Sequence, residues 1–115
     1  MRASLWALLL LLLASCSFDP DRTSSPTSRF VAVRSRVSAS VATFAVEDGY
    51  GHRIFAPPDR FAEPVVIAWD AAERLWIRTP AGVVVWAPRN VGADWAPLSA
   101  ADQAALVPPA DITAP

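Results

Sequence analysis

The sequence is poor in the residues on which most catalytic and metal sites depend. It has one cysteine and one histidine among 115 residues, and no lysine. A single cysteine excludes an internal disulfide, a zinc site built from several cysteines and a redox pair of the Cys-x-x-Cys type. A single histidine leaves little for general-base chemistry, because histidine is the side chain whose pKa ordinarily lies nearest to neutrality.

Positive charge is also scarce, and it is not clustered. The ten basic residues, all arginine, face 11 acidic residues and give a formal net charge of -1. Nucleic-acid binding needs clustered cations to neutralise phosphates, so we expect no nucleic-acid partner. The length allows at most one small domain. Much of the hydrophobicity lies in the first fifteen residues, and no later apolar stretch approaches the roughly 20 residues of a membrane-spanning helix.

The N-terminus has the order of residues typical of a secretory signal. Arg2 precedes an apolar run from Leu5 to Ala14, which is about half the length needed to cross a bilayer as a helix. The run closes on Leu13-Ala14-Ser15-Cys16. This motif resembles the lipobox of bacterial lipoproteins. The resemblance implies diacylglyceryl transfer to the Cys16 thiol, cleavage between Ser15 and Cys16, and acylation of the new amino group.

A lipid on Cys16 would make the membrane the first partner of the protein. Two or three acyl chains anchor a protein stably, whereas a single chain holds it only marginally. Ser17 follows Cys16, and the absence of an aspartate there favours an outer-membrane lipoprotein that faces the periplasm. The alternative is an ordinary secretory signal in which Cys16 has no role.

The composition of the remaining chain predicts a linker, one domain and a tail. Residues 17–28, with the sequence SFDPDRTSSPTS, are dominated by Ser, Thr and Pro. Such a segment buries too little apolar surface to fold. We therefore expect a flexible linker over residues 16–28 that reaches ~40 Å at most. A β-rich domain is expected over residues 29–107, and a frayed tail over residues 108–115.

β-branched and aromatic residues predict a mainly β fold, a small antiparallel sheet of hairpins with a short C-terminal helix. Strands are expected at residues 30–37, 39–46, 65–69, 74–78 and 83–87, and a helix at about residues 99–107 with Ser99 as its N-cap. Residues 88–96 are expected to form a loop. If the loops at 70–73 and 79–82 close symmetrically, Trp69 lies opposite Arg74 and Arg78 lies opposite Val83.

This pairing would give the hairpins two different faces. The face without charge, the better core candidate, carries Val66, Ala68, Leu75, Ile77, Val84 and Trp86. The other face would bring Trp69 and Trp76 together with Arg74 and Arg78. Trp and Arg are enriched at binding hot spots, so these four residues are a possible binding surface. Alternatively, the arginine stems only cover the indoles within the fold. Trp86 and Trp95 are expected in the core.

No combination of residues points to a reaction, a cofactor or a metal. His52 follows the turn at residues 48–51 without a second base or a nucleophile motif, and we interpret it as a turn residue. We therefore expect a non-enzymatic binding or structural module that contacts an envelope protein or a cell-wall component. The alternative is a periplasmic inhibitor or defence lipoprotein. The run from Gly82 to Asn90 is loosely similar to a strand of C-type lysozyme inhibitors, but the usual lysine and cysteine pair are missing.

Overall fold

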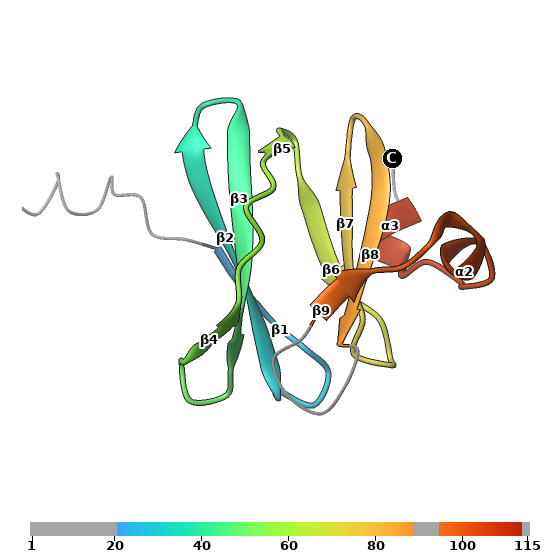
Figure 1. The fold of residues 1–115 in the computed structure, drawn as a ribbon, viewed down its shortest axis with the longest axis horizontal. Helices are drawn as coiled ribbons and strands as arrows, with labels where there is room; N and C mark the ends of the chain where they lie inside the picture. Colours follow the sequence, from blue (N-terminus) through green and yellow to red (C-terminus); the bar gives the residue numbers. More distant parts are fainter. Residues whose placement is uncertain (1–20, 89–94, 114–115) are drawn as a thin grey trace, which may run out of the picture.

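The computed structural model describes residues 21–88 and 95–113, which form two antiparallel sheets with two short helices (Figure 1). The first sheet has the order β1 (Asp21–Ser24), β2 (Phe30–Ser38), β3 (Val41–Asp48) and β4 (Arg53–Phe55), and β5 (Phe61–Ala62) also pairs with β3. The second sheet is a meander of β6 (Val66–Trp69), β7 (Leu75–Thr79), β8 (Gly82–Pro88) and β9 (Trp95–Pro97). The predicted mainly β fold of antiparallel hairpins is confirmed, although it consists of two sheets.

Aromatic rings from both sheets fill the space between them. Phe44 of the first sheet packs against Trp86 of the second, with ring centroids 5.5 Å apart. Phe30 packs against Trp95 at 5.1 Å, with its ring nearly perpendicular to the indole. Trp86 and Trp95 are only 6% and 4% exposed, which confirms that both belong to the core. A loop was expected over residues 88–96, but Pro88 belongs to β8, and Trp95 and Ala96 belong to β9. These two strands pair, with Pro88 opposite Trp95.

The first strand corrects the predicted linker. Residues 21–24 were expected to be flexible, but β1 pairs with β2 in the register Asp21↔Arg34 to Ser24↔Val31. Ser25 is buried, and its hydroxyl accepts a hydrogen bond from the Phe30 amide at 3.2 Å. The domain therefore begins at or before Asp21 instead of near residue 29. β1 is held by backbone pairing and polar contacts, which composition does not reveal.

The register between β6 and β7 is also different from the prediction. Trp69 lies opposite Leu75, and Ala68 lies opposite Trp76. The reason is the turn, in which Glu73 has a φ of 64° and the Asp70 amide donates to the Arg74 carbonyl at 3.0 Å. Arg74 thus belongs to the turn. A shift of one residue moves every side chain of a strand to the other face relative to its neighbour. The predicted pairing of Arg78 with Val83 between β7 and β8 is confirmed.

Two helices cover the outer face of the second sheet (Figure 1). The N-cap of α2 (Ala100–Ala104) is Ser99, whose hydroxyl accepts a hydrogen bond from the Asp102 amide at 3.1 Å, so the predicted N-cap is confirmed, but the helix ends at Ala104 instead of near residue 107. α3 (Ala110–Thr113) occupies the segment that was expected to fray. Its Ile112 is 3% exposed and packs with Trp76. The tail expected over residues 108–115 is therefore wrong for residues 110–113.

Candidate functional site

The predicted surface of two tryptophans and two arginines does not form. Trp69 packs between the sheets, where its indole N–H donates to the Thr23 carbonyl at 2.8 Å. Trp76 lies on the opposite face of the second sheet and is 1% exposed. The one-residue register shift separates the two indoles. The hypothesis of a single exposed patch is therefore wrong.

Both arginines of that hypothesis have structural partners. The Arg74 guanidinium donates to Asp70 Oδ2 at 2.6 Å, within the β6–β7 turn. The Arg78 guanidinium donates to the Ile112 carbonyl at 2.6 Å and so ties α3 to β7. Both arginines therefore bind groups within the fold instead of presenting a binding surface.

Asp70 organises the β6–β7 turn beneath Trp76. Its Oδ2 accepts from the Trp76 indole at 2.9 Å as well as from Arg74, and its Oδ1 accepts from the Ala72 and Arg74 amides, both at 2.9 Å. Burial raises the pKa of Asp70, but the hydrogen bonds from Trp76 and Arg74 and the positive charge of Arg74 outweigh it, so the pKa lies below its ordinary value. The carboxylate thus stays ionised and fixes the indole.

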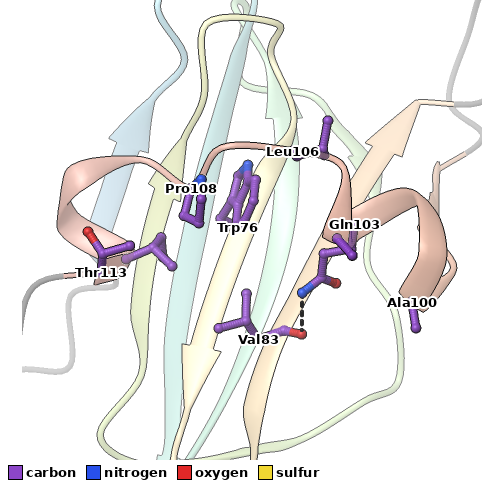
Figure 2. Close-up of a pocket in the computed structure, with 9 residues that line it drawn as sticks. Trp76, Val83, Ala100, Gln103, Leu106, Pro108 and Thr113 are labelled. Carbon is purple, nitrogen blue, oxygen red and sulfur yellow. Dashed lines mark hydrogen bonds between the residues drawn. The ribbon is translucent and has the colours of Figure 1, made fainter.

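An apolar groove lies above Trp76, between the two helices and the second sheet (Figure 2). It encloses about 480 Å³, within the range of small-ligand pockets. Its lining comes from β7, β8, both helices and the connection between the helices: Trp76, Val83, Ala100, Gln103, Ala104, Leu106, Pro108, Ile112 and Thr113. We call it the α2–α3 groove.

The groove has few groups that could bind a polar ligand. Among the described residues that line it, only Gln103 and Thr113 have an amide or hydroxyl side chain, and none is charged. The Gln103 amide nitrogen already donates to the Val83 carbonyl at 3.0 Å, as Figure 2 shows. The Trp76 ring is too deeply buried to serve as a stacking platform. The groove therefore suits apolar side chains better than a sugar or an ion.

A second hollow of about 460 Å³ lies between the edge strands β1 and β6, and it is more polar. Its lining includes Asp21 and Arg34, which form an ion pair at 2.5 Å. Arg34 also donates to Glu63 and to the Val65 carbonyl, at 3.3 and 3.2 Å. The Asp21 and Arg34 side chains that line this hollow are therefore already paired within the fold.

His52 lies in the β3–β4 turn, as predicted. Asp48 Oδ1 accepts from the Tyr50 and His52 amides, both at 2.9 Å, and the His52 ring is exposed. The backbone hydrogen bond from His52 lowers the pKa of Asp48, and that from Tyr50 lowers it further.

Phe55 and Phe61 pack against the core between the sheets, while Tyr50 is 89% exposed. In the described ranges no group of three or more His, Cys, Asp and Glu side chains could hold a metal ion.

Ser15 and Cys16, the residues of the predicted cleavage and lipidation, lie outside the described residues. Among residues 21–88 and 95–113, no helix has the length and apolar character needed to cross a membrane. The strand compared with lysozyme inhibitors is β8, and Arg89 and Asn90 beyond it lie outside the described part. No protein-family model, no curated protein and no solved structure matches the chain.

Proposed function

We propose that the protein is a lipid-anchored module of the bacterial cell envelope that binds another protein without catalysing a reaction. The observation that carries the proposal is the sequence Leu13-Ala14-Ser15-Cys16 at the end of a short apolar run. The leader is too short to span a bilayer as a helix, so an acylated Cys16, the only cysteine, would supply the anchor. The anchor would lie in the outer membrane, with the domain in the periplasm.

The α2–α3 groove supports the binding half of the proposal. Its lining is apolar and uncharged, and its one amide side chain is already bonded within the fold. A cell-wall glycan would need exposed ring faces and free hydrogen-bond partners, which the lining does not offer. An envelope protein that inserts apolar side chains fits it better.

The anchor is tested by Cys16→Ser in the full-length chain expressed in bacteria. The unmodified protein should incorporate a labelled fatty acid and stay with the membrane pellet after alkaline carbonate washing. Cys16→Ser should lose the label and leave the pellet, while the matched variant Ser17→Ala should keep both. A Cys16→Ser protein that still pellets after the wash would overturn the anchor.

The groove is tested by a photo-crosslinking residue placed on α2 of the anchored protein. Ala104 lines the groove, and Ala101 is an exposed residue of the same helix outside it. Crosslinking to one discrete envelope protein at position 104, and not at position 101, is the expected result. Equal labelling from both positions would remove the groove from the proposal.

A further inference from the structure

Few residues separate Cys16 from the first strand. Only residues 17–20 separate Cys16 from Asp21, where β1 begins. A chain of this length spans ~18 Å between the Cα atoms of Cys16 and Asp21 even when fully extended. The predicted linker would have reached about twice as far. A domain held this closely cannot turn freely above a bilayer.

The direction of β1 decides which end of the domain lies nearest to the anchor. β1 is antiparallel to β2, with Asp21 opposite Arg34 and Ser24 opposite Val31. From Ser24 to Asp21 the chain therefore runs toward the β2–β3 hairpin tip (residues 36–40), at the top of Figure 1. The tip lies ~16 Å beyond Arg34, at ~3.3 Å per residue. The extended reach of residues 17–20 matches this distance.

The opposite end of the domain is out of reach. The β3–β4 turn around Tyr50 lies beyond the Phe30↔Asp48 pair, ~20 Å from the level of Arg34 along the strands. To bring that turn to the bilayer, the chain before Asp21 would have to reverse its direction. A reversal uses two or more of the four linking residues, so the remaining reach falls to ~10 Å or less.

The hairpin tip has a composition that suits a membrane surface. Residues 36–40 are all exposed, and Val37, with 46% of its surface exposed, is one of three exposed large hydrophobic residues in the described ranges. Arg36 is the only charged residue between positions 35 and 46. Its side chain is 59% exposed, and its Nε lies 4.0 Å from Glu63 Oε2, at the outer limit of an ion pair. The guanidinium is therefore available for a phosphate group.

We infer that the β2–β3 hairpin tip rests on the phospholipid headgroups of the leaflet that holds the lipid on Cys16. Arg36 binds headgroup phosphates, and Val37 enters the interface. The inference rests on the proposed function, because it requires the anchor. The helices α2 and α3 lie on the outer face of the other sheet (Figure 1), so this orientation leaves the α2–α3 groove uncovered by the bilayer.

The test uses the lipidated protein in vesicles of phosphatidylethanolamine and phosphatidylglycerol. The Cys16 sulfur is blocked by its lipid, so Ala39→Cys and Tyr50→Cys each offer one free thiol for a fluorophore. Both positions are exposed and belong to turns at opposite ends of the domain. With spin-labelled lipids as quenchers, quenching at position 39 should exceed that at position 50 by about twofold or more, because quenching falls steeply with distance and the two positions lie ~36 Å apart along the strands.

Two further variants separate the causes. A Gly-Ser insertion of about 12 residues between Pro20 and Asp21 should reduce the difference, because a flexible chain removes the restriction. Arg36→Gln should lower the quenching at position 39 in phosphatidylglycerol vesicles, and Arg53→Gln, at an exposed arginine of β4 near the opposite end of the domain, should not.

The possible failures are distinguishable. If the labelled proteins float with the vesicles and position 50 is quenched as strongly as position 39, the orientation is wrong and the anchor stands. If neither protein floats with the vesicles, the anchor is missing, and the proposed function fails together with the inference.

Discussion

The indole N–H of Trp76 donates to the Asp70 carboxylate at 2.9 Å, so the most buried aromatic residue of the second sheet depends on a turn residue six positions earlier. The same carboxylate binds the Arg74 guanidinium and two backbone amides. The side chain of Asp70 is only 9% exposed, and the Trp76 indole, itself 1% exposed, has no access to water as a replacement partner.

Asp70→Ala should lower the free energy of unfolding by about 2–4 kcal/mol, because it leaves several donors, including a buried indole N–H, without an acceptor. Urea unfolding monitored by tryptophan fluorescence measures the loss. Asp59→Ala is the control, since Asp59 is exposed, and its effect should stay within about 0.5 kcal/mol. Equal effects of the two variants would contradict the role of Asp70.

Stability should fall in acid. The pKa values of Asp70 and Asp48 lie below their ordinary value of 3.8 in the folded protein. A carboxyl group whose pKa is lower in the folded than in the unfolded protein stabilises the fold at pH values above its unfolded-state pKa. This stabilisation is lost as the pH falls through its folded-state pKa. The urea midpoint should therefore change little from pH 7 to about pH 5 and decrease below about pH 4. Asp70→Asn should flatten the decrease, and an unchanged pH profile in that variant would be evidence against the assignment.

Ile112 tests whether the C-terminal helix belongs to the fold. Ile112→Ala should cost about 2–4 kcal/mol, because it removes a buried side chain packed on Trp76 and Val85. Val107→Ala is the matched control, since Val107 is 87% exposed, and it should change stability by less than about 0.5 kcal/mol. If Ile112→Ala were as mild as the control, the segment would be a frayed tail after all.

Trp69 tests whether β1 is an integral strand. Trp69→Phe keeps an aromatic ring between the sheets but removes the N–H that donates to the Thr23 carbonyl. We expect a loss of about 1–2 kcal/mol from the hydrogen bond and the smaller ring. Hydrogen exchange should also become faster in residues 21–24. Exchange in β1 that is already unprotected in the unmodified protein would show that the segment is a linker.

The strand positions could be predicted from the sequence because β-branched and aromatic residues mark them directly. Both hairpin strands β2 and β3 and the three strands β6 to β8 lie within a few residues of the expected positions. The cap of α2 could be predicted for a similar reason, since Ser99 and Asp102 form a local motif. These features depend on neighbours in the sequence.

The rest depends on contacts that local composition does not encode. β1 has the sequence DRTS and is held by pairing with β2 and by the ion pair of Arg22 with the buried Glu47 at 2.7 Å. The candidate surface failed because one residue, Glu73 at a φ of 64°, lengthens a turn and moves Trp69 and Trp76 to opposite faces. The α2–α3 groove could not be predicted, because it needs α3, a helix of only four residues.

The most direct test of the account is the intact mass of the mature protein, extracted with detergent from bacterial membranes. We predict a chain that begins at Cys16 and carries the added mass of a diacylglyceryl group, with a further acyl group on its amino terminus. A chain that begins elsewhere, or one with an unmodified Cys16 thiol, would contradict it.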